Sequence, residues 1–286
     1  MLIILLAEQG DIGLNLEQIL AQIKEAADRQ ARVVHFCEAA LSGYLGVDVP
    51  DGQLDWDALH AATKRVCQAA AEHEVWVLLG SAHRLTGDRK PHNSVYVIDD
   101  RGQVVERYDK RFCTGYDGPE PTLDHVWYTP GNHTAIFEID GFRASTLICY
   151  DYRFPELYRD LKRNGVQLVF QSFHNARRDY RTFHNRNLWK DLVPATMICH
   201  AATNHFWISS ANSSKKYSLW GSFVVRPDGR LVSKVPVQHP AVLISEIDAD
   251  LELWDAAQPW RDRAMQGELN SGTVPSDPRS DDRTSY

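Results

Sequence analysis

Short apolar runs alternate with amphipathic helical patterns in the N-terminal part of the chain, and this alternation constrains the fold more than any other feature. Strands are predicted at Leu2–Ala7, Val33–Phe36 and Val75–Ser81, and helices at Asn15–Gln30 and Trp56–Glu72. Asn15 is the expected N-cap of the first helix, because its side-chain oxygen can accept a hydrogen bond from a free backbone N–H. Strands joined by helices favour parallel pairing, so this region is expected to form βαβ units.

Hairpins interrupt this pattern further along the chain. Ser94–Ile98 and Val104–Tyr108 flank an Asp-Asp-Arg-Gly turn, and Ala135–Ile139 and Arg143–Ile148 flank a turn at Asp140-Gly141. The other predicted elements are a helix at Pro155–Arg163, a strand at Leu168–Gln171, a helix within Thr182–Ala202, and strands at Phe206–Ser209, Ser222–Val225 and Ala241–Ile247. This mixture predicts an α/β protein in which antiparallel strands extend parallel sheets.

The composition indicates how the chain divides into domains. It has 286 residues, of which 43% are hydrophobic, and this is enough for one large core. We expect a single domain over residues 1–255 and a polar C-terminal tail or arm over residues 256–286. From Gly267 onward the sequence is rich in Ser, Asp, Arg and Pro and poor in large apolar residues. Such a segment buries little surface by itself and is expected to order only on a partner.

Charge and cysteine usage exclude several function classes. The net charge of −7 and the pI near 5.9 are unlike those of a nucleic-acid-binding protein. No run approaches the ~20 apolar residues of a membrane span, so we expect neither a nucleic-acid nor a membrane partner. The five cysteines are widely spaced and form no Cys-x-x-Cys pair. They therefore predict free thiols, a reducing cytoplasmic location, and neither a metal site nor a cofactor.

Cys149 stands where a predicted strand meets a predicted helix. The apolar run before it reads as a buried strand, and Pro155 suits the first turn of the helix that follows. The first turn of a helix leaves backbone N–H groups without internal partners, and these groups can bind an anion. A thiol held rigidly at such a turn has the placement of a cysteine nucleophile.

Two charged residues occupy the same kind of position. Glu38 follows the predicted strand Val33–Phe36, and Lys110 follows Val104–Tyr108. The carboxyl ends of strands are where open α/β sheets bind ligands. A free thiol has a pKa near ~8.5, so a neighbouring carboxylate can accept its proton and an ammonium can stabilise the negative charge that develops. Glu38, Lys110 and Cys149 are therefore the candidate catalytic residues.

Three segments resemble the three signatures of the carbon–nitrogen hydrolase (nitrilase-like) family. The segment HFCEAALSGY resembles the signature around the family's catalytic Glu, and ERYDKRF resembles the segment that holds its Lys. LICYDYRFPELYRDL is similar to the signature around its nucleophilic Cys, in a form typical of the amidase-type branch. Weaker similarity extends over roughly residues 1–250.

The resemblance implies a four-layer α-β-β-α sandwich and a homodimer or a larger homo-oligomer. It implies that Cys149 attacks the carbon of a small-molecule amide and that Glu38 transfers protons. Lys110 and the backbone N–H of Tyr150 would stabilise the oxyanion. Loss of ammonia or an amine would leave a thioester intermediate on Cys149, which water then hydrolyses.

The chain also departs from the family pattern. Cys37 stands where the family usually has Pro, and the family's second Glu is represented by Asp124 or by the nearby Glu120. Further candidates for substrate contact are His174 and Asn175, which follow a predicted strand end, and the aromatic Tyr44, which could line the pocket. A basic cluster could attract a carboxylate on the substrate; it comprises Arg177, Arg178, Arg181, Arg186 and Lys190.

Several alternatives remain open at this level. Within the family, an N-carbamoyl amino acid hydrolase or a nitrilase would use the same three residues. A papain-like Cys–His pair would make Glu38 dispensable. A non-catalytic interaction protein on the same fold would not need a reactive Cys149.

Overall fold

The computed structural model describes residues 2–4, 10–175, 188–284 and 286. Its strands form two six-stranded sheets within these residues. The first sheet has the order β12-β1-β2-β3-β4-β5 and the second has the order β11-β10-β9-β8-β7-β6. The first comprises β1 (Leu2–Ile4), β2 (Val33–His35), β3 (Trp76–His83), β4 (His92–Ile98), β5 (Val104–Asp109) and β12 (Val242–Ile244). The second comprises β6 (Ile136–Ile139), β7 (Phe142–Ile148), β8 (Leu168–Ser172), β9 (Trp207–Ala211), β10 (Phe223–Val225) and β11 (Leu231–Lys234).

Both sheets are built on the same plan. Three parallel strands form the centre of each sheet, β1-β2-β3 in the first and β7-β8-β9 in the second. Antiparallel strands extend both sheets, and β3-β4-β5 and β6-β7 include the two predicted hairpins. The predicted mixture of parallel units and hairpins is therefore confirmed.

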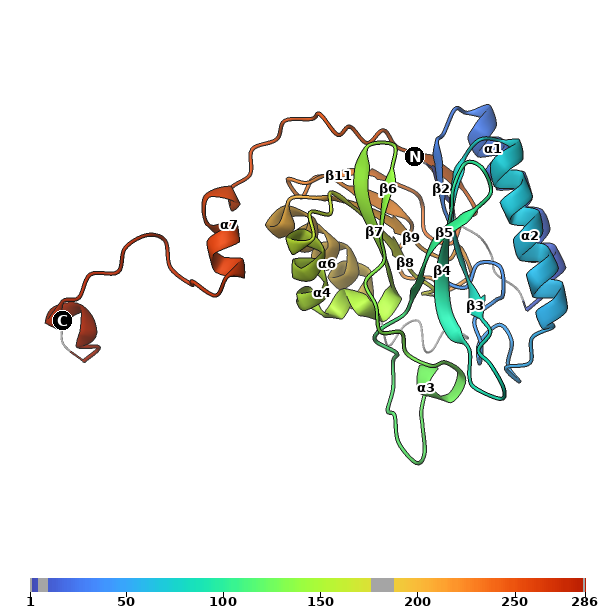
Figure 1. Ribbon diagram of the computed structural model, residues 1–286, viewed down its shortest axis with the longest axis horizontal. Coiled ribbons are helices and arrows are strands. Elements are labelled where there is room, and N and C mark those ends of the chain that lie inside the picture. Colours follow the sequence, from blue (N-terminus) through green and yellow to red (C-terminus); the bar gives the residue numbers. More distant parts are fainter. Residues whose placement is uncertain (1, 5–9, 176–187, 285) are drawn as a thin grey trace.

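Helices cover the outer faces of the two sheets (Figure 1). Helices α1 (Ile12–Asp28) and α2 (Trp56–Glu72) lie on one side of the molecule, and α4 (Pro155–Arg163) and α6 (Trp189–Asn204) lie on the other. The short elements are α3 (Asp124–Trp127), the 3-10 helix η1 (Cys149–Arg153), α7 (Gln258–Met265) and α8 (Pro278–Asp281). The layers are α-β-β-α, so the predicted fold class is confirmed.

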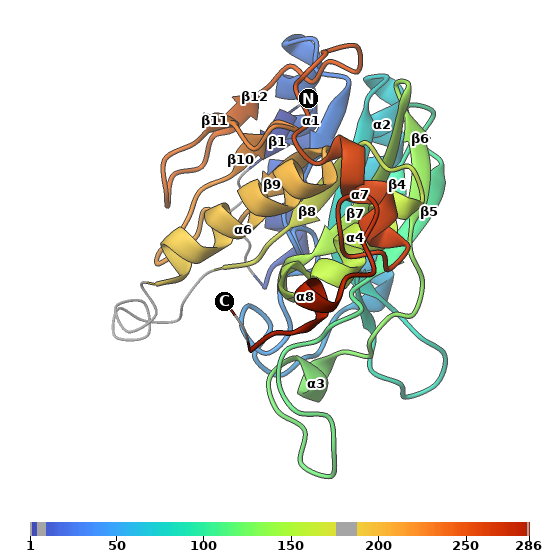
Figure 2. The ribbon, with the colours of Figure 1, turned by 90° about the vertical axis from the view of Figure 1, so that its left-hand side faces the viewer.

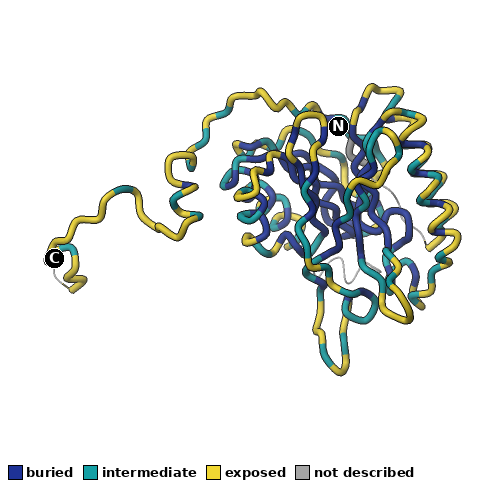
Figure 3. Tube along the Cα trace, in the orientation of Figure 1, coloured by how far each residue is buried: buried dark blue, intermediate teal, exposed yellow. Residues whose placement is uncertain are grey.

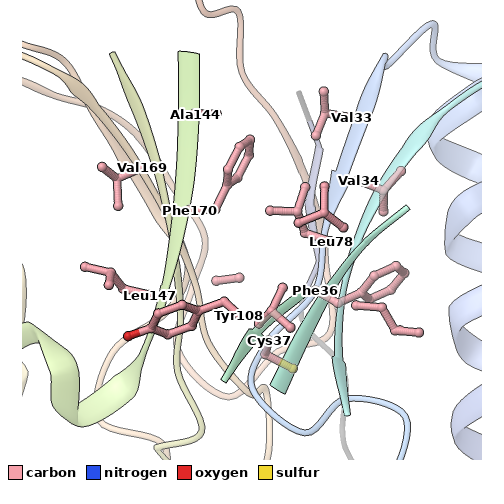
Figure 4. Close-up of a cluster of buried hydrophobic side chains, with 14 of the residues drawn as sticks. Val33, Val34, Phe36, Cys37, Leu78, Tyr108, Ala144, Leu147, Val169 and Phe170 are labelled. Atoms are coloured by element: carbon pink, nitrogen blue, oxygen red, sulfur yellow. The ribbon is translucent and has the colours of Figure 1, made fainter. Parts of the chain in front are cut away.

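The core fills the space between the sheets (Figure 4). Phe170 of β8 and Tyr108 of β5 are almost completely buried there. His35 is a polar group at the centre of this core, with its Nδ1 2.8 Å from Ser209 Oγ and its Nε2 3.0 Å from Ser172 Oγ. Burial lowers the pKa of His35 to about 3, so the ring is neutral. These contacts join β2 to β8 and β9 across the sandwich, and they fix the strand ends that carry the candidate site.

One N-terminal prediction is wrong. Asn15 does not cap the first helix, because the helix begins earlier, at Ile12, and Asp11 caps it by accepting a 3.1 Å hydrogen bond from the Leu14 amide. Asn15 is buried and its Nδ2 donates to the carbonyl of Leu41 at 3.1 Å. Its side chain therefore anchors the loop that follows Glu38.

The C-terminal segment crosses the outer face of the second sheet's helices and then leaves the body (Figures 1 and 2). Helix α7 is attached by Arg261, which donates to the carbonyl of Thr203 at 3.0 Å, and by Arg163, which donates to the carbonyl of Met265 at 3.0 Å. Beyond α7 most residues are exposed (Figure 3). The division at residue 255 stays a prediction. Within the described residues, no helix has both the length and the apolar character that a membrane crossing requires.

Candidate active site

Glu38 lies just beyond β2 and is completely buried. Its Oε1 accepts hydrogen bonds from Lys110 Nζ at 2.9 Å and from Asn93 Nδ2 at 2.8 Å. Its Oε2 accepts a bond of 2.8 Å from the backbone amide of His174, which follows β8. The carboxylate is therefore held by donors from both sheets, and its position is fixed before any substrate binds.

Lys110 directly follows β5, and only 1% of its side chain is exposed. Its ammonium contacts two carboxylates, Glu38 at 2.9 Å and Asp124 at 2.8 Å, and it lies 3.4 Å from the Tyr44 hydroxyl. Burial by itself would lower the pKa of Lys110, but the charges of Asp124 and Glu38 outweigh it and hold this pKa well above its usual value. Lys110 is therefore a permanent buried cation.

Asp124 is the acid that reaches Lys110. The left-handed backbone of Leu123, with φ of 52°, turns the chain so that Asp124 opens α3. Its Oδ1 accepts a 2.6 Å bond from the Tyr44 hydroxyl, and its Oδ2 accepts bonds from the Lys110 ammonium and, at 2.9 Å, from the Thr114 amide. Burial opposes ionisation, but Lys110 and these donors keep the pKa of Asp124 below its usual value. The backbone thus compensates for a side chain one methylene shorter than Glu, whereas Glu120 is exposed.

Cys149 is the first residue of η1, directly after β7. Its φ of +40° places a non-glycine residue in the left-handed region, which is a strained conformation. Burial and the neighbouring Glu38 carboxylate raise the pKa of the thiol, and the Lys110 ammonium opposes them. The thiol is therefore protonated at rest, within electrostatic range of both a carboxylate and an ammonium.

Asp151 connects the two segments that carry Cys149 and Lys110. Its Oδ2 accepts bonds from the Ile148 amide at 3.0 Å and from the Tyr108 hydroxyl at 2.8 Å. Its Oδ1 accepts a 2.9 Å bond from the Phe112 amide. Burial outweighs these donors and raises the pKa of Asp151 to about 6. One buried carboxyl group thus joins residues on either side of Lys110 to the residue before Cys149.

A cavity of about 640 Å³ opens over these groups. Cys149, Lys110 and Asp124 line its inner end, while Glu38 lies behind them with no exposed surface. The other residues predicted to contact substrate also line it, namely Tyr44, Tyr150, His174 and Asn175. The structure therefore brings all the predicted site residues to one place, with Glu38 just behind the cavity surface.

The outer part of the cavity is aromatic and carries one guanidinium. Arg153 is exposed, and its guanidinium carbon lies 4.2 Å from the ring centroid of Trp189 and 5.2 Å from that of Tyr152. No carboxylate of the described residues forms a salt bridge with it. An anionic part of a ligand could therefore pair with Arg153 without displacing a carboxylate of the described residues.

A second charged group supports the cavity wall from behind. The buried Asp48 accepts bonds from His174 Nε2 at 2.9 Å and from the Tyr44 amide at 3.0 Å, and it also pairs with Lys215. Burial would raise the pKa of Asp48, but the charges of His174 and Lys215 hold it well below its usual value. Asp48, Lys215 and Asn93 were not predicted, because each contacts residues distant in the sequence.

Part of the predicted basic cluster lies outside the described residues, namely Arg177, Arg178, Arg181 and Arg186. Its remaining member, Lys190, lines a different cavity. In the part of the chain that the structure describes, His, Cys, Asp and Glu side chains do not gather in groups of three or more that could hold a metal ion.

Solved structures with the same architecture belong to an amidase of Nesterenkonia. One of them, a cysteine-to-alanine mutant of that enzyme, has a TM-score of 0.73 at 22% identity and covers 93% of this chain and 95% of its own. At this identity the likeness concerns the fold.

Proteins with similar sequences include two amidases and a further hydrolase. A 2-oxoglutaramate amidase of Bacillus subtilis is 29% identical over 188 residues, which are 63% of this chain and 65% of that enzyme, just under two thirds of its length. An omega-amidase of Xenopus tropicalis is 26% identical over 83% of this chain and 83% of its own. A hydrolase of Pseudomonas protegens is 30% identical over 84% of this chain and 79% of its own.

The family model for carbon–nitrogen hydrolases matches residues 7–256, which include Glu38, Lys110, Asp124 and Cys149. This match covers most of the chain and agrees with the architecture of the two facing sheets. The family predicted from the three sequence segments is thereby confirmed, and the chain belongs to the carbon–nitrogen hydrolase family.

Proposed function

We propose that this protein is an amidase that uses Cys149 as its nucleophile, Glu38 as its general base and acid, and Lys110 as its oxyanion-stabilising cation. One observation supports this proposal above all others: a buried Glu38–Lys110 pair, 2.9 Å apart, lies at the inner end of a cavity that Lys110 and Cys149 both line. Burial of two charges is costly, and this cost is typical of a site that performs chemistry. The amidases among the similar proteins support the reaction type.

The reaction begins with the protonated thiol. Because burial and Glu38 raise the pKa of Cys149, the sulfur needs a base at the moment of attack. Glu38 accepts the thiol proton while Sγ forms a bond to the amide carbon. The carbonyl oxygen becomes an oxyanion, which Lys110 Nζ and the Tyr150 backbone N–H stabilise.

Breakdown of this intermediate releases the nitrogen. The C–N bond breaks, Glu38 returns its proton to the leaving nitrogen, and ammonia or an amine departs. Water then attacks the thioester while Glu38 accepts one of its protons. The C–S bond breaks, the sulfur recovers the proton from Glu38, and a carboxylic acid leaves.

We propose small amides that carry a carboxylate as the preferred substrates. Arg153 supports this choice, because it lines the cavity and its guanidinium forms no salt bridge with a carboxylate of the described residues. A 2-oxoglutaramate amidase and an omega-amidase among the similar proteins also support it. N-carbamoyl amino acids combine a C–N bond with a carboxylate in the same way and are the second candidate class.

Replacement of the nucleophile tests the reaction. The Cys149→Ala variant should release no ammonia from a panel of small amides and carbamoyl compounds, and wild-type protein should accumulate an acyl adduct detectable by intact mass spectrometry. Cys199→Ala is the matched control, because Cys199 is exposed and distant in sequence from the site residues. Ammonia release by Cys149→Ala at the wild-type rate would refute the covalent scheme. A wild-type protein inert toward the whole panel would favour the non-catalytic alternative.

We also propose a reducing, cytoplasmic location and a homo-oligomeric state. The five free cysteines support the first proposal. Exposed apolar side chains of the C-terminal segment support the second, among them Trp254 at 84% exposure and Leu269 at 84%. Light scattering on the full chain tests the oligomeric state.

A further inference from the structure

A second cavity lies beside the first, with a volume of about 430 Å³. It is bordered by α6 and by the hairpin of β10 and β11. Most of its lining is apolar, including Pro194, Phe223 and Leu231, and two lysines, Lys190 and Lys234, complete it. A cavity with this lining suits an elongated apolar group.

The two cavities share a wall. Among the described residues, Trp220 is the one that lines both. At the start of α6, Trp189 lines the first cavity and the adjacent Lys190 lines the second. The two cavities therefore meet at Trp220 and lie on either side of the start of α6.

The Trp220 indole is held by packing. Only 5% of the residue is exposed, and its ring meets Phe173 edge to face at a centroid distance of 5.3 Å. Its backbone is fixed, because the carbonyl accepts a 2.7 Å bond from Asn212 Nδ2. The buried indole Nε1, in contrast, has no hydrogen-bond partner among the described residues. Replacing or displacing this ring therefore costs packing but breaks no hydrogen bond of the indole N–H within the described residues.

We infer that Trp220 sets the upper limit on the length of the substrate's acyl chain and that the second cavity is an extension of the substrate site, closed by its indole. The inference rests on the proposed function in one respect: the ligand is taken to be an amide whose carbonyl lies at Cys149. The class of ligand that the joined cavities would accept is an amide with a long, unbranched, apolar acyl chain. The wild-type protein accepts the short members of that class.

Chain-length dependence tests this inference. Wild type, Trp220→Phe and Trp220→Ala are assayed by ammonia release from straight-chain primary amides of increasing length. For wild type, kcat/KM should fall once the acyl chain of the amide exceeds a short length. For Trp220→Ala, each further methylene that enters the second cavity should raise kcat/KM by roughly fourfold, the equivalent of burying one CH₂ group. The dependence of kcat/KM on chain length in Trp220→Phe should lie between those of wild type and Trp220→Ala.

A matched variant controls for loss of a buried aromatic group. Phe206→Ala removes a ring that is 1% exposed and lines neither cavity, so the length preference should stay that of wild type. Thermal unfolding identifies the variants that fold, because a Trp→Ala change in a core is strongly destabilising. If Trp220→Ala does not fold, Trp220→Phe and Trp220→Leu carry the test.

A binding measurement separates this inference from the proposed function. In the Cys149→Ala background, calorimetry compares the affinity of long and short amides with and without the Trp220 substitution. A gain in affinity for long amides supports the inference even if wild type hydrolyses none of them. An unchanged ratio of long to short affinities in a folded Trp220 variant overturns it, whether or not the wild type is an amidase.

Discussion

The inner and outer parts of the cavity are built differently. At the inner end, Glu38 accepts three hydrogen bonds and Asp124 accepts three, and Lys110 donates to both. At the outer end, Arg153 rests on the ring faces of Tyr152 and Trp189 and forms no salt bridge with a described carboxylate. The inner end thus holds its geometry without a ligand, which suits reaction chemistry. The outer end is packed but weakly bonded, so substitutions there should change the choice of substrate and leave the chemistry intact.

The largest expected effect is at the inner end, on replacing Lys110 by Met. The variant loses one oxyanion donor, so kcat for a small amide should fall at least ~100-fold. It also leaves the Glu38 and Asp124 carboxylates without their common cation, which should destabilise the fold by about 3–5 kcal/mol. Steady-state kinetics and thermal unfolding measure the two effects.

Lys24→Met is the control for that substitution. Lys24 pairs with Asp28 on an exposed helix face, and its side chain is 62% exposed. Its removal should leave both kcat and stability close to those of wild type. A Lys110→Met variant with the wild-type kcat would show that the inner end does not stabilise the oxyanion through this ammonium.

A second prediction concerns the carboxyl group that joins the two catalytic segments. Because burial raises the pKa of Asp151 to about 6, the native state binds more protons than the unfolded state between about pH 4 and pH 6. The contribution of Asp151 to stability is therefore greatest below this window and falls as the pH rises through it, by on the order of 3 kcal/mol.

Asp151→Asn should remove this pH dependence. The variant should also be less stable than wild type at low pH, because its NH₂ group faces a backbone donor in place of an oxygen. Chemical unfolding at a series of pH values measures both effects. An Asp151→Asn variant with the same decline in stability between about pH 4 and pH 6 would assign the titration to another group.

The strand ends could be predicted from the sequence, and the contacts between them could not. Apolar runs followed by Glu38, Lys110 and Cys149 predict that these residues end strands, since a strand's period and length are local properties. The helices at 56–72 and 155–163 were likewise predicted with the bounds that the structure has. That Glu38, Lys110 and Cys149 share one site was inferred from their positions at strand ends and from the family resemblance. Their side-chain contacts depend on the order of strands in two sheets, which one sequence does not reveal.

Side-chain partners from distant segments were the least predictable features. Asn93 looks like an ordinary strand residue, yet it holds Glu38, and Asp48 looks like a solvated loop acid, yet it is buried against His174. Asp151 looks like a residue of a local turn, yet it bonds to Tyr108 and Phe112 as well as to the nearby Ile148. Pairing of this kind is decided by tertiary packing, for which one sequence carries no periodic signal.

The smallest expected effect is at the outer end and depends on the substrate. Arg153→Met removes the guanidinium that we propose to pair with a substrate carboxylate, and kcat/KM for a dicarboxylic acid monoamide should fall by about tenfold, in line with a charge-assisted hydrogen bond. A neutral amide of the same chain length should be hydrolysed as before, because the inner end is untouched. Arg153→Lys should recover part of the loss, since it keeps the charge without the planar fork.

The response to salt decides whether this effect is electrostatic. Arg153 is exposed, so its attraction for an anionic substrate should weaken as ionic strength rises, and the difference between wild type and Arg153→Met should narrow accordingly. A loss of activity that is equal for anionic and neutral amides, and unaffected by salt, would mean that Arg153 acts by stacking on Trp189. The distinction between a fixed inner end and a substrate-selecting outer end would then rest on the aromatic residues alone.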